Sequence, residues 1–170
     1  LVFAFSRHVI PPPVEWQRES HIHVPGYFHL PAQAYQPPAD LVAFLAAGES
    51  PVCITFGSMI NRRLEEMLAL ILEAVRQAGR RAVLLSGWGG APVSAAGVFA
   101  IEAVPHDWLF PRCCLVIHHG GAGTTAAALR SGTPSMVIPL AGDQPFWARR
   151  VDALGVGPRS IRARELSVEG

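Results

Sequence analysis

The sequence contains no lysine. All fourteen basic residues of the 170-residue chain are arginines, and the formal net charge is +1. A P-loop lysine, a Schiff-base lysine and a lysine general base are therefore excluded. The small net charge does not favour binding to nucleic acid or to an anionic membrane. Because no apolar run approaches the roughly 18 residues that span a bilayer, no transmembrane segment is expected, and no signal peptide is expected either.

Cysteine is also scarce. The three cysteines are Cys53, Cys113 and Cys114, and no Cys-x-x-Cys spacing occurs. An odd number, with two adjacent, argues against a disulfide framework and a zinc knuckle. The His21-x-His23 pair resembles a metal pair but lacks a suitably spaced third ligand, so we expect no metal and no cofactor. A reducing cytoplasm is expected, and the arginine and alanine bias indicates a GC-rich genome.

The sequence is rich in apolar residues, which make up 50% of the chain, whereas charged residues make up 16%. This composition permits a sizeable core. Residues 1–39 are rich in proline and lack periodicity, which predicts an extended connector between domains. Residues 40–170 are regular and predict one domain. The length fits one ordinary domain or one half of a larger enzyme.

From Asp40, expected as a helix N-cap, short apolar runs alternate with helical patterns. We expect strands at 51–56, 81–86, 98–104, 115–118 and 135–138. Helices are expected at 41–47, from Asn61 to Gly79, at 107–112, at 124–131 and at 145–154. Strands that are apolar throughout are typical of a parallel sheet covered on both faces. The sequence therefore predicts an α/β fold, a Rossmann-like doubly wound parallel sheet whose ligands bind at the carboxyl ends of the strands.

The richest of the strand-end loops runs from His119 to Thr125 (HGGAGTT). Glycines allow close approach of a ligand, and the following helix presents unpaired N–H groups that suit a phosphate. His119 can add a hydrogen bond to a diphosphate. The alternative is a tight turn whose small residues serve helix–sheet packing.

The same loop matches the dinucleotide fingerprint G-x-G-x-x-A, and Asp143 follows Gly123 by twenty residues. An NAD site was therefore considered. The fingerprint belongs after the first strand, however, whereas this loop follows the fourth, and Asp143 lies beyond the next strand. We favour a sugar nucleotide over NAD.

Five further residues lie in strand-end loops. Asp143 and Gln144 offer the mixed donors and acceptors that sugars need, although an Asp before a helix is also an ordinary N-cap. Ser58 is either a phosphate contact or a turn residue. Trp88 is either a stacking ring or a hydrophobic lid. His106 is more typical of a satisfied loop histidine than of a catalyst.

Together these loops resemble the C-terminal, donor-binding domain of the GT-B glycosyltransferases in the UDP-glycosyltransferase superfamily, in particular the sterol glucosyltransferase-like and bacterial antibiotic branch. The resemblance lies in VIHHGGAGTT (116–125), GTP (132–134), PLAGDQP (139–145), FGSM (56–59), SGW (86–88) and VPGY (24–27).

This resemblance implies roles for individual residues. His119 and the amides of Gly121, Ala122, Gly123 and Thr124 would hold the donor diphosphate, with Ser58 near the phosphates. Asp143 and Gln144 would hold sugar hydroxyls, and the backbone at Val104 would meet the base, with Trp88 a possible neighbour.

The family's reaction is inverting transfer of a hexose from a UDP- or dTDP-sugar to a hydroxyl of a lipid-like or natural-product acceptor. The general base would lie in the enzyme's own N-terminal domain, so no catalytic residue is expected in this chain. A sugar-nucleotide epimerase lobe and a non-enzymatic nucleotide-binding partner subunit are the alternatives.

Overall fold

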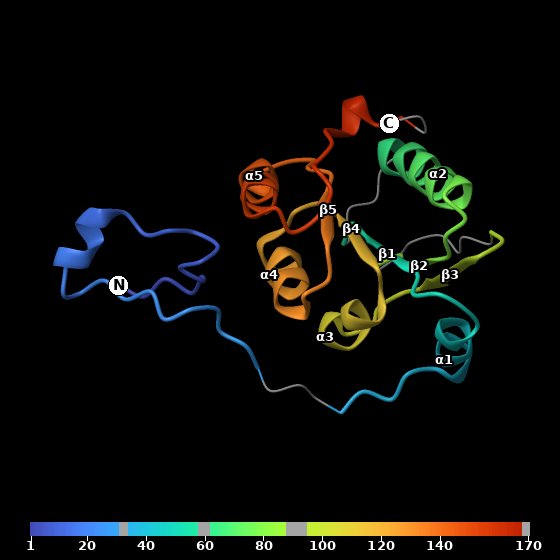
Figure 1. Cartoon of the computed structure of the whole chain (residues 1–170), viewed down its shortest axis with the longest axis horizontal. Coiled ribbons are helices and arrows are strands. Elements are labelled where there is room, and N and C mark those ends of the chain that lie inside the picture. The colour runs from blue at the N-terminus through green and yellow to red at the C-terminus, as the bar shows by residue number, and fades with distance from the viewer. Residues whose placement is uncertain (31–33, 58–61, 88–94, 168–170) are drawn as a thin grey trace. The chain divides into compact units, whose positions relative to one another are not determined.

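The computed structural model describes residues 1–30, 34–57, 62–87 and 95–167 and divides the chain into two compact units, Leu1–Ala34 and Tyr35–Gly170 (Figure 1). The first unit contains one 3-10 helix, Val14–Arg18. The two ends of this unit's segment pair through a backbone hydrogen bond, in which the Phe3 N–H donates to the His23 carbonyl at 2.8 Å. The Phe3 ring stacks on Trp16 with centroids 4.5 Å apart. This proline-rich unit therefore has its own local packing.

The second unit is built on a five-stranded parallel sheet of order β3-β2-β1-β4-β5. Its strands are β1 (Val52–Thr55), β2 (Ala82–Leu85), β3 (Val98–Ile101), β4 (Leu115–His118) and β5 (Ser135–Val137). Every residue of β1 and β2 is buried. The predicted Rossmann-like α/β fold is confirmed, and the strand order reverses between β1 and β4.

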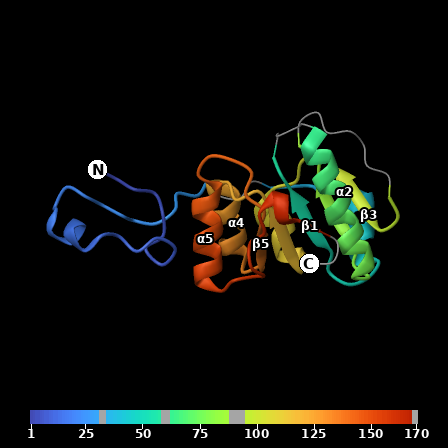
Figure 2. The same ribbon diagram turned by 90° about the horizontal axis from the view of Figure 1, so that it is seen from above.

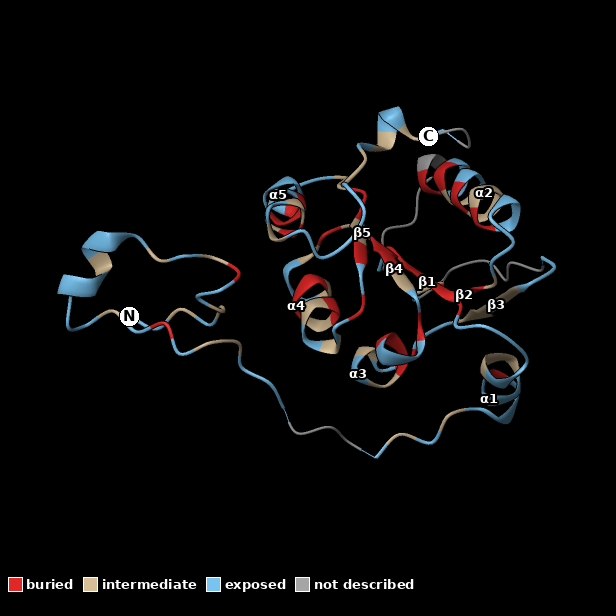
Figure 3. Cartoon of the chain, viewed as in Figure 1, coloured by how far each residue is buried: buried red, intermediate tan, exposed pale blue. Residues whose placement is uncertain are grey.

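Helices cover both faces of this sheet (Figures 1 and 3). They are α1 (Ala39–Ala46), α2 (Arg62–Gln77), α3 (His106–Leu109), α4 (Ala122–Ser131) and α5 (Gln144–Leu154), with 3-10 turns at Phe110–Arg112 and Ala163–Glu165. On one face, Ile54 packs with Met67 and Ile71 of α2. On the other face, Cys53 packs with Leu41 of α1, Leu109 of α3 and Ala128 of α4.

The side chains of successive strand residues thus point into opposite cores, because side chains alternate between the two faces of a sheet. A third apolar cluster joins Val137 of β5 to Ala148 and Val151 of α5. Figure 2 shows α4 and α5 side by side at the β5 edge, with α2 at the other end of the sheet.

Three predicted boundaries were wrong by two or more residues. Helix α1 begins at Ala39, so Pro38 rather than Asp40 occupies the N-cap position. Strand β3 ends at Ile101 instead of Val104, because its single neighbour β2 ends at Leu85, the residue paired with Ile101. Helix α4 begins two residues before Thr124, at Ala122. The expected N-cap Asn61 lies outside the described residues.

Gly157 marks the tightest packing around β5. The chain beyond α5 runs along β5, where the Ser135 N–H donates to the Val156 carbonyl at 3.3 Å and the Ile161 N–H to the Val137 carbonyl at 3.1 Å. A Cβ atom at Gly157 would lie 2.1 Å from the Ser135 carbonyl oxygen. Backbone cannot yield as the end of a side chain can, so only glycine fits here.

We therefore expect Gly157→Ala to lower the free energy of unfolding by about 2–4 kcal/mol, the range of severe overpacking. Urea denaturation of the 170-residue chain measures this. Gly48→Ala is the matched control, because its Cβ would meet only the flexible Arg81 side chain, at 3.4 Å. Equal stability of the two variants would contradict the packing described here.

Within the described parts of the chain, no helix is long and apolar enough to cross a membrane. The same residues contain no cluster of three His, Cys, Asp or Glu side chains that could hold a metal ion.

Candidate functional site: the carboxyl edge of the sheet

The carboxyl ends of the parallel strands meet at one edge of the sheet, and the loops that leave β1, β2, β3 and β4 converge there. A cavity of about 180 Å³ opens among the first three of these loops. It is lined by Thr55, Gly57, Leu85, Gly87, Glu102, Ala103, Val104 and His106. Val104, whose backbone was predicted to meet the base, is therefore on this cavity wall, with its side chain buried.

His119 lies at the point where the strand order reverses, between the turns that follow β1 and β4. A Cβ atom at Gly121 would lie 2.5 Å from its Nε2 atom, and one at Gly57 would lie 3.7 Å from its Cε1 atom. The imidazole thus lies directly against Gly121, where any larger residue would push the ring away. Its Nδ1 atom is buried without a hydrogen-bond partner among the described residues.

The charge state of His119 is set by competing effects. Burial lowers its pKa, whereas a hydrogen bond with the Thr55 backbone and the carboxylate of Asp143 raise it, burial being the larger effect. The imidazole is therefore neutral at pH 7 in the ligand-free protein, and an anion beside it would favour its protonation.

The first turn of α4 follows at once. Its N-cap residue, Gly121, offers no side-chain cap, and the first helical hydrogen bond is donated by Thr125 to the Gly121 carbonyl at 2.9 Å. The N–H groups of Ala122, Gly123 and Thr124 lie before the first helical hydrogen bond, so the helix itself provides no acceptor for them. A Cβ atom at Gly123 would meet nothing within 4 Å. This helix start can accept an anion at close range.

His118 and Gly120 fix the turn that leads into α4. The Gly120 N–H donates to His118 Nδ1 at 3.1 Å, and Gly120 has a positive φ of +89°. A Cβ atom at Gly120 would lie 2.6 Å from Val137 Cγ1. His118 is fully buried, and burial lowers its pKa to about 3. It is therefore a neutral structural histidine.

Asp143 and Gln144 lie at the start of α5. Asp143 occupies the N-cap position, but its carboxylate makes no capping hydrogen bond. Asp143 Oδ2 instead accepts from the indole Nε1–H of Trp147 at 2.8 Å. Gln144 Oε1 accepts from the N–H groups of Leu140 and Ala141 at 2.7 and 2.9 Å. Asp143 is therefore at the N-cap position considered from the sequence, but its side chain does not make the capping hydrogen bond. The Gln144 oxygen stabilises the β5–α5 loop.

The other predicted site residues are Ser58 and Trp88, and both lie outside the described residues. Sequence reasoning missed Trp147, which follows Asp143 by four residues, a helical spacing that could have signalled the pair. His106, interpreted from the sequence as a loop histidine, lines the cavity and stacks on Phe110 with ring centroids 4.5 Å apart.

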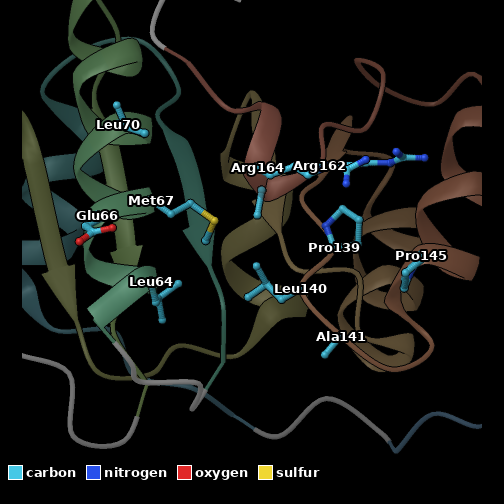
Figure 4. A pocket seen from close by; sticks show the side chains of 11 residues that line it. Leu64, Glu66, Met67, Leu70, Pro139, Leu140, Ala141, Pro145, Arg162 and Arg164 are labelled. Carbon is cyan, nitrogen blue, oxygen red and sulfur yellow. The ribbon is translucent and has the colours of Figure 1, made fainter.

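A larger groove of about 640 Å³ lies between α2, the β5–α5 loop and the turn at Ala163–Glu165 (Figure 4). Apolar side chains dominate it, with Leu64, Met67 and Leu70 on the α2 side and Pro139 and Leu140 on the other. None of the predicted site residues that the structure describes lines it.

A parallel sheet with a histidine and a glycine-capped helix at its switch point is typical of nucleotide-binding α/β domains. Comparison with known proteins identifies the family of this domain. Residues 92–167 match the family "Erythromycin biosynthesis protein CIII-like, C-terminal domain". The chain is 44% identical over 170 residues to a sterol 3-beta-glucosyltransferase of Arabidopsis thaliana, covering 98% of the chain and 26% of that protein.

Two further relatives support the same family. The chain is 37% identical over 169 residues to the O-mycaminosyltylonolide 6-deoxyallosyltransferase of Streptomyces fradiae, covering 99% of the chain and 39% of that protein. The crystal structure of the glycosyltransferase SnogD from Streptomyces nogalater matches with a TM-score of 0.64 and 30% identity, over 84% of this chain and 38% of that one. The chain thus belongs to the C-terminal domains of family 1 glycosyltransferases.

The fold match extends further. A UDP-glucose:anthocyanidin 3-O-glucosyltransferase superposes with a TM-score of 0.79 at 17% identity, over 99% of this chain and 42% of that one. The predicted GT-B half is therefore confirmed. The chain spans 26–39% of the length of the two curated relatives named above. Their names describe sugar transfer and do not favour the epimerase or partner-subunit alternative.

Proposed function

We propose that this chain is the donor-binding half of an inverting glycosyltransferase, which transfers a hexose from a UDP- or dTDP-sugar to a hydroxyl of a lipid-like or natural-product acceptor. The observation that carries the proposal is the position of His119 against Gly121, at the uncapped start of α4. Three backbone N–H groups and an imidazole at one helix start suit the two phosphates of a nucleotide sugar.

Each group has a defined task in the proposed reaction. The acceptor oxygen forms a bond to the anomeric carbon, the bond from that carbon to the diphosphate breaks, and the nucleoside diphosphate leaves with the electron pair. Negative charge therefore grows on the diphosphate oxygens, where His119 and the α4 amides would stabilise it. The resemblance assigns the acceptor proton to a base in the N-terminal half.

The remaining site residues would complete donor recognition. Val104 and its neighbours on the 180 Å³ cavity would receive the base, and Asp143 and Gln144 would contact the sugar. Ser58 would lie near the phosphates and Trp88 near the base. The proposal needs no metal or cofactor, since the protein would supply the donors to the diphosphate.

The names of the relatives limit the range of substrates to be considered. One describes glucose transfer to a sterol, another 6-deoxyallose transfer to a macrolide precursor, and one solved neighbour is a UDP complex. These names support a hydroxylated, largely apolar acceptor and leave UDP and dTDP donors both in the proposal. A bacterial, cytoplasmic enzyme remains part of the proposal.

Isothermal titration calorimetry of the 170-residue chain with UDP, UDP-glucose and dTDP-glucose tests the proposal. Binding heat is expected with at least one of these ligands. Folded protein that binds none of them, or that binds NADH in preference as judged by its fluorescence, would contradict it.

Gly123→Ala separates binding from stability. A methyl group here meets no protein atom, so folding should be unaffected or stabilised by up to about 1 kcal/mol. The same methyl would stand where the diphosphate approaches, and we expect the affinity for UDP to fall about tenfold, or ~1.4 kcal/mol. Calorimetry and a thermal melt measure both quantities. Gly48→Ala, at the amino edge of the sheet, should bind as wild type, and unchanged binding by Gly123→Ala would place the diphosphate elsewhere.

A further inference from the structure

We infer that Trp147 is a positioning residue, whose indole N–H holds the Asp143 carboxylate in the orientation that receives a hydroxyl of the donor sugar. This inference rests on the proposed function. The carrying contact is the 2.8 Å hydrogen bond from Trp147 Nε1 to Asp143 Oδ2.

Several observations make this contact more than a surface hydrogen bond. Trp147 is buried, with 8% of its surface exposed. Asp143, in contrast, is exposed. A rigid, packed donor thus fixes a carboxylate that faces outward. The contact spans one turn of α5, so the helix sets its geometry.

The carboxylate has no alternative role in the helix. The Asp143 side chain does not cap α5, since it is the backbone carbonyl of Asp143 that accepts from the N–H groups of Phe146 and Trp147. Oδ1, the second oxygen, accepts no hydrogen bond from the described residues. With Oδ2 bound to the indole, Oδ1 remains available as a fixed acceptor.

The direction of this acceptor is relevant to the proposed donor site. Asp143 lies close enough to His119 to raise the pKa of that imidazole. The loop before Asp143 is held by Gln144, which binds two backbone N–H groups. The carboxylate is therefore preorganised from both sides, beside the residue proposed to bind the diphosphate. A sugar attached to that diphosphate would extend toward Oδ1.

Trp147→Phe tests the inference, because it keeps an aromatic ring and removes only the donor. Calorimetry of the 170-residue chain should show an affinity for UDP-glucose, or for dTDP-glucose if that is the donor bound, lowered about 5- to 20-fold, as for loss of one oriented charged contact. Binding of the free nucleoside diphosphate should change less than twofold. Trp147→His, which restores an N–H donor, should recover part of the loss.

Phe146→Leu is the matched control, since it alters the neighbouring aromatic ring on α5 and leaves the Asp143 contact in place. It should bind both ligands as wild type. A thermal melt of each variant separates misfolding from lost recognition.

A double-mutant cycle distinguishes positioning from packing. If Trp147 acts through Asp143, Trp147→Phe should cost little further affinity in an Asp143→Asn background. Additive losses, equal losses for the sugar nucleotide and the free diphosphate, or wild-type binding by Trp147→Phe would overturn the inference. No binding of free UDP or dTDP by the wild-type chain would instead refute the proposed function.

Discussion

Replacing His119 with Ala is expected to lower the affinity for UDP-glucose about 10- to 100-fold, the effect of losing one hydrogen bond to a charged group. The imidazole lies against Gly121, at the first turn of α4, and no other described side chain occupies that position. His119→Gln, which keeps an N–H donor at similar reach, should retain most of the binding. Calorimetry measures both variants, with the exposed His29→Ala as control.

The same site predicts a pH dependence of binding. Burial lowers the pKa of His119 in the free protein, and a bound diphosphate would raise it. Binding then takes up a proton, so UDP-glucose should bind more tightly as the pH falls from 8 toward the lowered pKa. UDP-glucose suits this test because its diphosphate diester keeps its charge over that range. His119→Gln should flatten the profile, and an unchanged slope in that variant would exclude His119 as the group responsible.

Acid destabilisation is the second large effect expected. Burial lowers the pKa of His118 to about 3, against about 6.5 in the unfolded chain. Between these values the unfolded chain binds the extra proton, so stability falls as the pH drops through this window. For one group the loss amounts to about 1.4 kcal/mol per pH unit, or up to about 3 kcal/mol at pH 4.

Urea denaturation at pH 7.5, 6.5, 5.5 and 4.5 measures this slope. His118→Asn keeps an acceptor for the Gly120 N–H and removes the titration, so its stability should vary less with pH than that of the wild type. His106 and His119, whose pKa values burial also lowers, would leave a residual slope. An identical pH profile in His118→Asn would show that folding does not lower the pKa of His118.

The sheet was predictable because its strands are apolar runs bounded by turn residues. Strand β4 was predicted at the residues where it lies, since Leu115–His118 stands between a cysteine pair and a glycine turn. Strand β3 was extended too far because the apolar run continues to Val104, whereas its length is set by β2, its single neighbour in the sheet. Strand pairing is a tertiary constraint that a local pattern does not contain.

The sequence predicted which residues form the candidate site, and the structure adds contacts that the sequence did not predict. His119 and the glycines after it were found from their loop, and the structure adds that the imidazole lies against Gly121. Asp143 was considered as a helix cap, and its contact with Trp147 depends on how α5 packs. The four-residue spacing allows this pair, whereas the burial that fixes the Trp147 ring is a tertiary feature that the local sequence does not specify.

The most direct test of the central claim is a ¹⁵N–¹H correlation spectrum of the chain titrated with UDP or dTDP. If the diphosphate binds at the start of α4, the largest shifts should fall on the amides of Gly121 to Thr124, with further shifts at Gly57 and Val104. Shifts confined to residues around the 640 Å³ groove, such as Leu64, Met67 and Leu140, would contradict the claim.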